Sequence, residues 1–276
     1  MLVARSLLFV PATRPERFAK AFESGADCII IDLEDAVSPD SKDSARDQLA
    51  QHLPLFPPVQ LARLLVRVNA TGTEWHDRDI ESLRDWTRQG LTVMLPKSED
   101  AGVVGRVGER LGSGARIVAL IESLAGLDAA DSLAREKHVL RLAFGHLDFQ
   151  LDLGMSASPD EHELAFARNA LVCASRRSRL PAPIDGVTTA TGNAERLAAD
   201  ARRSRAFGFG CKLCIHPAQV AGVHEALGYS EADQAWARRV LAEAARRGGE
   251  AFSLDDRMVD LPVIHAAQKI VASAQR

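Results

Sequence analysis

The sequence is poor in aromatic residues, which make up 5% of its 276 positions, and it carries no strong charge of either sign. Proteins that bind single-stranded nucleic acid stack bases on aromatic side chains, so their scarcity argues against that role. A net charge of −3 also lacks the basic surface that nucleic acids require. The paired arginines fall within expected helices and indicate solvated helix faces. We therefore expect no nucleic-acid partner.

Cysteines and long hydrophobic runs are scarce as well. The four cysteines are too few and too scattered for the disulfide framework of a secreted protein, which indicates a reducing cytoplasm. Cys211 and Cys214 form a C-x-x-C pair inside an expected strand, where alternate side chains face opposite ways, so we expect buried, unreactive thiols. The apolar stretch from Leu7 to Val10 is too short for a signal peptide or a membrane span. No membrane association is expected.

What the sequence does contain is a regular alternation of short apolar runs with longer amphipathic stretches. This pattern predicts strands alternating with helices and a parallel sheet. Eight strands are expected, near 5–10, 27–33, 64–68, 92–95, 116–121, 140–144, 183–186 and 212–215. Eight such units favour a (β/α)8 TIM barrel with a C-terminal helical extension. An open doubly wound sheet is the alternative, because the seventh and eighth runs are short.

The helices between these strands are expected near 15–24, 40–52, 77–89, 99–111, 124–136, 160–177, 193–206 and 217–227. Beyond them lies a tail that barrel closure does not require, with helical patterns near 231–247 and 262–274. We therefore divide the chain into a catalytic barrel, 1–228, and a C-terminal helical arm, 229–276. The arm is expected to act as a lid or to lie at a subunit interface. Its last helix carries an apolar set that we expect to need a partner surface, namely Leu261, Ile264, Ile270 and Val271.

Several of the expected strands end abruptly in charged residues. Because the carboxyl ends of the strands meet at one rim of a parallel barrel, these charges are expected around a single cavity. Glu122 and Asp148 follow successive strands and can hold Mg²⁺ or Mn²⁺ while water and substrate fill the other positions. Either residue alone is better explained as an ion-pair partner or a helix cap. The two together favour a metal site.

An arginine ends the third expected strand. Arg67 can hold a carboxylate or a developing enolate oxygen in a bidentate fork, which a lysine could not match. Its alternative role is a salt bridge to Glu34 and Asp35, and the two roles are compatible. Because Asp32, Glu34 and Asp35 alternate in direction at the end of the second strand, at least one of them is expected only to brace arginines.

An ordered set of motifs resembles one known family and extends over nearly the whole chain. The motifs lie at Arg5 to Pro11, Asp32 to Val37, Val66 to Asn69, Ile121 to Ser123, Phe144 to Gly154, Ile184 to Gly186, Ile215 to Gln219 and Met258 to Pro262. They are similar to those of the citrate lyase β-subunit-like proteins of the HpcH/HpaI aldolase and citrate lyase superfamily. This group includes the citryl-, malyl- and citramalyl-CoA lyases.

The resemblance implies a TIM barrel that uses Mg²⁺ to cleave or form a carbon–carbon bond next to a CoA thioester. It implies that Glu122 and Asp148 are the metal ligands and that Arg67 holds the substrate's oxygens. A retro-Claisen cleavage of a 3-hydroxyacyl-CoA would leave a thioester enolate and an oxo acid, and both develop negative oxygen that these groups can stabilise.

Further roles follow from the same resemblance. Arg14 and Lys20 correspond to contacts with CoA phosphates, with Phe9 nearby. Asp260 corresponds to an acidic residue that the family's C-terminal arm brings into play, typically over an adjacent subunit. It is our candidate for the general base, and it leads us to expect a homo-oligomer, a trimer or a hexamer.

The chain departs from the family's pattern at three places. It has Ala12 where glycine is frequent, His146 and Leu147 before the expected metal aspartate, and Cys211 where glycine is common. None of these changes removes an expected ligand. They leave the acyl-CoA and the oxo acid unspecified.

Three other functions stay open at this point. A thioesterase that hydrolyses malyl-CoA would use the same metal and the same enolate chemistry. A class II pyruvate aldolase without CoA usually carries histidine after the second-strand glutamate, where this chain has Asp35, so the CoA branch is favoured. A non-catalytic barrel that binds a ligand or an acyl-carrier partner is disfavoured because Glu122, Asp148 and Arg67 are all present.

Overall fold

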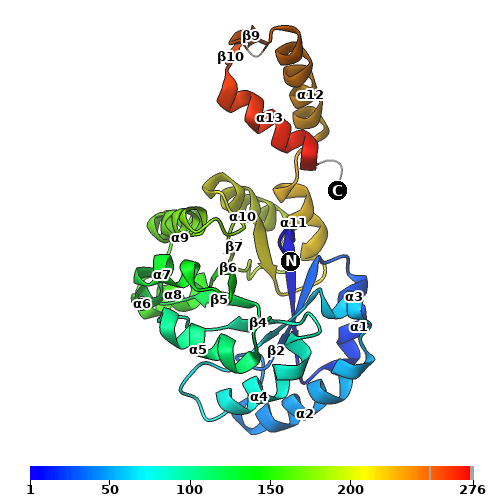
Figure 1. The fold of residues 1–276 in the computed structure, drawn as a ribbon, viewed down its shortest axis with the longest axis vertical. Helices are drawn as coiled ribbons and strands as arrows, with labels where there is room; N and C mark the ends of the chain where they lie inside the picture. Colours follow the sequence, from blue (N-terminus) through cyan, green and yellow to red (C-terminus); the bar gives the residue numbers. More distant parts are fainter. Residues whose placement is uncertain (249, 274–276) are drawn as a thin grey trace. The chain divides into compact units, whose positions relative to one another are not determined.

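Eight parallel strands of the chain close into a barrel (Figure 1). The structure is a computed structural model and describes residues 1–248 and 250–273. The strands pair in chain order, and the last pairs back onto the first. They are β1 (Ser6–Pro11), β2 (Cys28–Asp32), β3 (Leu64–Arg67), β4 (Thr92–Leu95), β5 (Ile117–Ile121), β6 (Val139–Phe144), β7 (Ile184–Asp185) and β8 (Cys211–Cys214). The predicted (β/α)8 barrel is confirmed, and the open-sheet alternative is wrong because β8 pairs with β1 and every strand has two neighbours, so the sheet has no edge.

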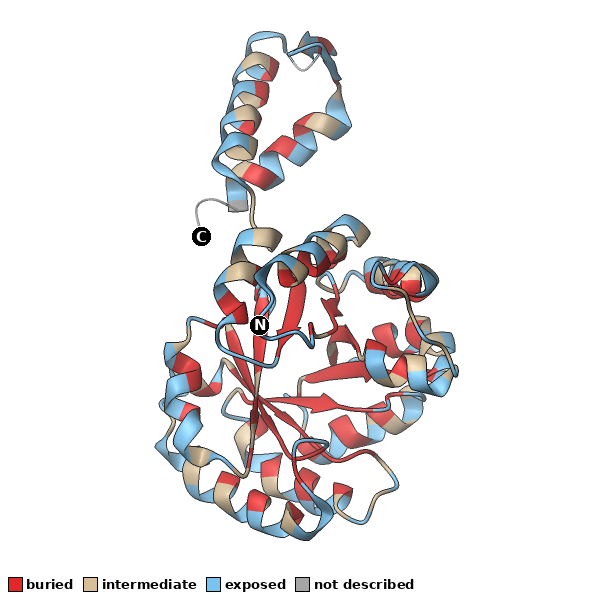
Figure 2. Ribbon diagram, turned by 180° about the vertical axis from the view of Figure 1, so that it is seen from behind, coloured by how far each residue is buried: buried red, intermediate tan, exposed pale blue. Residues whose placement is uncertain are grey.

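The strands are apolar because both of their faces are covered. Every strand contributes to one buried cluster inside the barrel, which includes Leu7, Ile30, Leu65, Met94, Val118, Ala143, Ile184 and Leu213. The alternate residues, such as Ile29 and Ile31, are equally buried and face the helices. Figure 2 shows the strands buried along their length and the helices buried only on their inner sides. A strand covered on both faces reads as a continuous apolar run, which is why the sequence identified these segments.

The helices of the barrel unit are α1 (Phe18–Glu23), α2 (Lys42–His52), α3 (Pro58–Leu61), α4 (His76–Thr87), α5 (Ala101–Leu111), α6 (Leu124–Asp128), α7 (Ala130–Arg135), α8 (His146–Asp152), α9 (Ala165–Arg177), α10 (Ala194–Phe207) and α11 (Gln219–Leu227). Short 3-10 turns lie at Pro15–Arg17, Pro39–Ser41, Leu53–Leu55 and His162–Leu164. The sequence did not predict α3 or α8. It also predicted one helix over 124–136, where α6 and α7 form separately.

A buried ionic layer fastens the short strand β7 to the surrounding helices. Alternation sends Ile184 into the barrel and Asp185 outward, where Arg168 Nε donates to Asp185 Oδ1 at 3.2 Å. Ser204 also donates to Asp185, and Lys212 Nζ donates to the Gly186 carbonyl at 2.7 Å. Burial alone would raise the pKa of Asp185, but the charges of Lys212 and Arg168 lower it to about 2. Asp185 is therefore ionised in the folded protein, and its negative charge stabilises the buried positive charges of Lys212 and Arg168.

We predict that Asp185→Asn lowers the free energy of unfolding by about 3–5 kcal/mol at pH 7, because it removes a buried counter-charge of Arg168 and Lys212. The folded pKa of about 2 lies below the ordinary value of 3.8, so the stabilisation is complete above about pH 4 and is lost as the pH falls toward 2. Urea unfolding across this pH range measures both effects.

The control for this prediction is Asp131→Asn, which removes an exposed ion pair with Arg177 whose shortest distance is 3.0 Å. Exposed pairs contribute about 0.2–1 kcal/mol, so this variant should unfold nearly as the parent does. An equal loss of stability in both variants would contradict the assigned role of Asp185.

The C-terminal residues form a second compact unit, His224–Arg276. It contains α12 (Glu231–Arg246), the antiparallel pair β9 (Phe252–Leu254) and β10 (Arg257–Val259), and α13 (Leu261–Ser273). The hairpin was not predicted. Its two turn residues, Asp255 and Asp256, both have positive φ, 52° and 59°, as the two-residue turn with both central residues left-handed requires.

The second unit has a core of its own, built from Ala237, Val240, Ala244, Phe252, Val259, Ile264, Ala267 and Ile270. The expectation that the whole apolar set of the last helix needs a partner surface is therefore wrong, since Ile264 and Ile270 are covered within the same chain. Leu261, in contrast, is 58% exposed. The division between the units falls inside α11, slightly before the boundary at 228–229 expected from the sequence.

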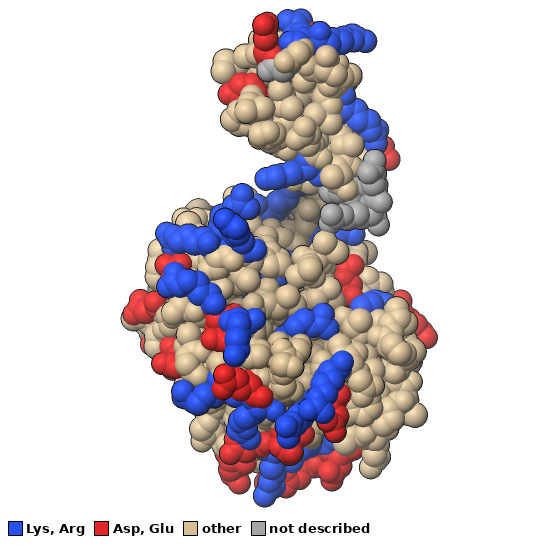
Figure 3. Space-filling view, in the orientation of Figure 1, with Lys and Arg blue, Asp and Glu red and all other residues tan. Residues whose placement is uncertain are grey.

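The surface carries charges of both signs. On the face shown in Figure 3, basic and acidic side chains are interspersed over the barrel unit. None of the helices within the described residues is sufficiently long and apolar to cross a bilayer. The buried thiols of Cys211 and Cys214 have their pKa raised to about 12, chiefly by burial, in agreement with the expected unreactive pair.

Candidate active site at the barrel rim

The predicted charged residues of the barrel lie at the carboxyl ends of four strands. Glu34 and Asp35 follow β2, Arg67 is the last residue of β3, Glu122 follows β5 directly, and Asp148 lies in α8 just after β6. The parallel closure of the barrel brings these strand ends to one rim. Their mutual electrostatic effects, described below, show that they lie within reach of one another.

Arg67 is the centre of this rim. Its Nε donates to Asp32 Oδ1 at 2.7 Å and its Nη2 donates to Asp32 Oδ2 at 2.6 Å, a two-bond fork. Its Nη1 donates to Asp35 Oδ2 at 3.1 Å. The same Nη1 lies 3.0 Å from Glu34 Oε2, an ion pair whose alignment makes no hydrogen bond. Acidic residues at the end of β2 thus hold Arg67 in place, as predicted, and Asp32 accepts two of its three hydrogen bonds.

The geometry corrects the expectation that the fork of Arg67 is available to substrate. Of the five N–H groups of a guanidinium, three are used in the hydrogen bonds to Asp32 and Asp35, and two remain. Burial opposes the charge of Arg67, but the carboxylates around it raise its pKa further. Arg67 is therefore a fixed cation with two N–H groups left for another oxygen.

Glu34 is a buried carboxyl beside this cation. Burial raises the pKa of Glu34 to about 8. The charge of Arg67 opposes the shift, whereas the nearby carboxylates of Asp35 and Glu122 add to it. Burial is the largest of these effects, and it prevails. Glu34 can consequently hold or release a proton near neutral pH.

Glu122 is held in place by the backbone of the neighbouring strand end. The N–H of Lys97, just after β4, donates to Glu122 Oε1 at 2.8 Å. Burial raises the pKa of Glu122 to about 7; the Lys97 hydrogen bond opposes the shift and the charge of Asp148 adds to it. The two carboxylates that were predicted to act together are thus close enough to repel one another.

The donor set at this position suits a hard divalent cation. Glu122 and Asp148 present oxygen atoms only, the ligand type that Mg²⁺ and Mn²⁺ prefer, and a cation between them would offset their repulsion. Within residues 1–248 and 250–273, no group of three or more histidine, cysteine or acidic side chains is arranged to enclose a metal ion. A two-carboxylate site is compatible with that, because Mg²⁺ usually retains several waters and a substrate oxygen.

The residues expected to contact CoA lie at the first strand and its helix. Phe9 of β1 is half-buried, and its ring lies 4.9 Å from the guanidinium carbon of Arg67. Arg14 is exposed and its Nε donates to Glu16 Oε1 at 2.6 Å. Lys20 is exposed on α1. The structure therefore brings Phe9 to the rim arginine, while the two cations remain at the surface.

Asp260 lies in the second unit, immediately before α13. Its Oδ1 accepts from the N–H of Val263 at 3.4 Å, which caps the helix. The side chain is partly exposed. The helix cap is the structural role that this residue has within its own unit.

Two features of the rim were not predicted. Lys97 has a left-handed backbone, φ 47°, and Gly145 lies against Glu122, where a Cβ atom would come within 2.7 Å of Glu122 Oε2. The position of Lys97 after an apolar run ending in proline was visible in the sequence, but its backbone angle was not. The glycine before α8 was visible as part of a motif, without its neighbour.

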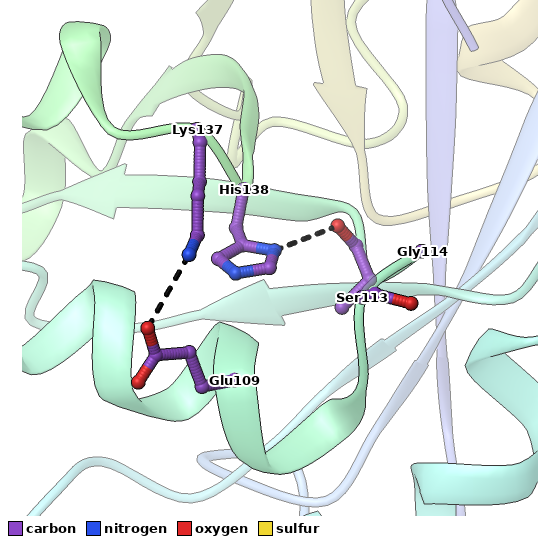
Figure 4. Close-up of a pocket in the computed structure, with 6 residues that line it drawn as sticks. Glu109, Ser113, Gly114, Lys137 and His138 are labelled. Carbon is purple, nitrogen blue, oxygen red and sulfur yellow. Dashed lines mark hydrogen bonds and ion pairs between the residues drawn. The ribbon is translucent and has the colours of Figure 1, made fainter.

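A pocket of about 560 Å³ lies at the other ends of the strands. Figure 4 shows its lining, where Lys137 Nζ lies 3.3 Å from Glu109 Oε1 and His138 Nδ1 lies 3.3 Å from the Ala115 carbonyl oxygen. These residues precede β5 and β6, at the face of a barrel that serves stability. We therefore take the charged rim, and not this pocket, as the candidate active site.

A (β/α)8 barrel with a buried cation and several perturbed carboxyl groups at the carboxyl ends of its strands defines a barrel enzyme. The sequence model of the HpcH/HpaI aldolase/citrate lyase family matches residues 5–217. The chain belongs to this family. The resemblance of its ordered motifs to the family, and the prediction that it is a lyase, are confirmed.

Individual relatives match over nearly their full lengths. A citrate lyase subunit beta-like protein from Deinococcus radiodurans is 36% identical, over 97% of this chain and 96% of its own. A (3S)-malyl-CoA thioesterase from Cereibacter sphaeroides is 30% identical, over 98% of this chain and 94% of its own. Protein CitE from Mycobacterium tuberculosis, solved in complex with magnesium, acetoacetate and coenzyme A, is 34% identical, with 100% of both chains covered and a TM-score of 0.87.

Proposed function

We propose that the protein is a Mg²⁺-dependent lyase that cleaves or forms the carbon–carbon bond of a 3-hydroxyacyl-CoA such as citryl-, malyl- or citramalyl-CoA. The observation that carries the proposal is the pair Glu122 and Asp148 beside the fixed cation Arg67. The mycobacterial relative, with magnesium, acetoacetate and coenzyme A in its structure, supports the same chemistry for this chain.

Each rim residue has a role that its geometry permits. Glu122 and Asp148 would hold Mg²⁺ or Mn²⁺, which when bound supplies Lewis-acid polarisation of the substrate's oxygens. The remaining N–H groups of Arg67 can stabilise negative oxygen that develops during cleavage. Glu34, with its pKa of about 8, can store a proton beside that oxygen, and Asp35 keeps Arg67 oriented.

The CoA part of the substrate is assigned to the first βα segment. Arg14 and Lys20 are exposed cations that can pair with phosphate groups, and Arg14 would exchange its contact with Glu16 for a phosphate. Phe9 belongs to the same segment, and its ring, against the guanidinium of Arg67, can contact the thioester arm. The oxo acid would then lie over the carboxylates.

The substrate is best identified by a mass-spectrometric screen. Purified protein is incubated with citryl-, malyl- and citramalyl-CoA, with Mg²⁺ or with excess chelator. Cleavage predicts a shorter acyl-CoA and an oxo acid that appear only with the metal. Turnover that is unaffected by the chelator would contradict the proposal.

A malyl-CoA thioesterase is the second candidate, favoured by the relative from Cereibacter sphaeroides at 30% identity. The same screen separates the two reactions. A lyase releases acetyl-CoA and glyoxylate from malyl-CoA, whereas a thioesterase releases free CoA and malate.

Asp148→Asn should abolish metal-dependent turnover while the fold is retained, because an amide oxygen carries no charge for a divalent cation. Asp152→Asn is the matched control on the same helix, where Asp152 caps α6 through Leu124 N–H at 2.8 Å. Turnover with added Mg²⁺ and circular dichroism measure the two effects. Full activity in Asp148→Asn would remove this residue from the metal site.

Arg67→Lys should reduce kcat about 10²–10³-fold, since a single ammonium cannot hold Asp32 in a fork and also reach a substrate oxygen. Arg63→Lys provides the control at the opposite end of β3, where Arg63 Nε donates to the Asp27 carbonyl oxygen at 2.9 Å. Steady-state kinetics should show a near-parental kcat for that control. A kcat within a few-fold of the parent in Arg67→Lys would limit Arg67 to bracing its acidic neighbours.

We also propose that Asp260 acts as the general base over the metal site of an adjacent subunit in a homotrimer or a multiple of one. The exposed side chains of Met258 and Leu261, 71% and 58%, leave apolar surface beside Asp260 for such a contact. Inactive Asp260→Ala subunits mixed with inactive Asp148→Asn subunits should recover part of the activity, because one mixed site would carry both intact residues.

The mixing experiment requires proof that subunits exchange, for example by mass spectrometry of differently tagged chains. A control mixture of Asp148→Asn with Glu122→Gln should stay inactive, since both changes affect the same half of the site. Absence of recovery after verified exchange would place Asp260 in its own chain's site or outside catalysis.

A further inference from the structure

We infer that Lys97 and Gly145 are positioning residues that clamp the carboxylate of Glu122 from two sides, so that Oε1 is held by the protein and Oε2 is presented to the cation. This inference rests on the proposed function, in which Glu122 is a metal ligand. It gives a structural role to Lys97 and Gly145, which follow different strands and take no direct part in the proposed reaction.

The Lys97 side of the clamp depends on an unusual backbone. At φ 47°, Lys97 adopts a left-handed conformation that few residues other than glycine adopt. In this conformation the chain turns directly after the Lys97 N–H, which donates to Glu122 Oε1 at 2.8 Å. Strain of this kind persists only where the surroundings impose it, and it is found preferentially at functional sites.

Those surroundings are formed by the residues that follow Lys97. Ser98 N–H donates to the Leu120 carbonyl at 3.1 Å, and its hydroxyl donates to the Leu95 carbonyl at 2.9 Å. Ser123 Oγ donates to Glu99 Oε1 at 2.6 Å. The segment after β4 is therefore fastened to the end of β5 on both sides of Glu122, which fixes the direction of the Lys97 N–H.

The Gly145 side of the clamp depends on a missing atom. A Cβ at position 145 would lie 2.7 Å from both Cβ and Oε2 of Glu122, closer than such atoms approach. The absence of a side chain lets Glu122 lie directly against the backbone between β6 and α8. Because φ at Gly145 is −89°, an alanine is acceptable to the backbone, and its effect would come only from this contact.

The two sides together make the oxygens of Glu122 unequal. Oε1 is engaged by a backbone donor, while Oε2 lies on the side of β6 and α8, the helix that carries Asp148. We therefore expect Glu122 to bind the cation through Oε2 alone. Residues that orient a ligand in this way typically change metal affinity about 10- to 100-fold when they are altered.

The first test measures Mn²⁺ binding by the loss of the free-ion electron paramagnetic resonance signal. Gly145→Ala should bind Mn²⁺ about 10- to 100-fold more weakly than the parent, because the added methyl group displaces Glu122. Gly114→Ala is the control, since a Cβ there would meet nothing within 4 Å. Circular dichroism and thermal melting confirm that each variant is folded.

A second pair of variants tests the Lys97 side and does not depend on Gly145→Ala folding. Lys97→Gly and Lys97→Val both remove the ammonium, but glycine tolerates a positive φ and valine does not. Lys97→Gly should bind Mn²⁺ as the parent does, and Lys97→Val should bind it at least tenfold more weakly. Equal affinities in the two variants would show that the backbone of Lys97 does not position Glu122.

The outcomes separate this inference from the proposed function. If the parent binds no Mn²⁺, the metal role of Glu122 is wrong and the clamp falls with it. If the parent binds Mn²⁺ and Glu122→Gln does not, the metal role stands. In that case, unchanged affinity in a folded Gly145→Ala would overturn the clamp alone.

Discussion

The rim of this barrel depends on the compensation of negative charge in a buried place. Asp32, Glu34 and Glu122 are all buried, and carboxylates repel one another strongly where little water screens them. Arg67 offsets this repulsion through its fork to Asp32 and its ion pair with Glu34. Its own burial is tolerated because its partners raise its pKa further. Arg67 is thus needed to assemble the rim, whatever part it takes in the proposed reaction.

One arginine does not neutralise the whole rim. Glu34 keeps a pKa of about 8 and Glu122 a pKa of about 7, so both carboxyl groups can gain or lose a proton near neutral pH. A divalent cation beside Glu122 and Asp148 would favour the ionised form of Glu122. This is the physical reason why the site suits a metal ion: a divalent cation would compensate carboxylate charge that burial makes unfavourable.

The sequence was sufficient for features that depend on residue type. The eight strands were predicted because a strand covered on both faces is apolar throughout, and the rim followed from charged residues placed directly after such runs. The motif that contains Asp185 could be recognised in the sequence. Its buried contact with Arg168 could not, because Arg168 lies on a helix elsewhere in the chain. The fork between Arg67 and Asp32 was missed as well: the sequence predicted a salt bridge from Arg67 to Glu34 and Asp35, whereas the two-bond contact is made with Asp32.

The features that were missed depend on main-chain geometry or on which surfaces meet. The left-handed angles of Lys97, Asp255 and Asp256 are uncommon for residues other than glycine, so residue type alone does not locate them. The partner of Ile264 and Ile270 proved to be a core within the same chain, which periodicity alone cannot distinguish from a subunit contact. At the rim, the same limitation concealed how Glu122 is held. The backbone N–H of Lys97 and the missing Cβ of Gly145 cannot be inferred from patterns of charge or hydrophobicity. In the inference above, they nevertheless determine which oxygen of Glu122 faces the site.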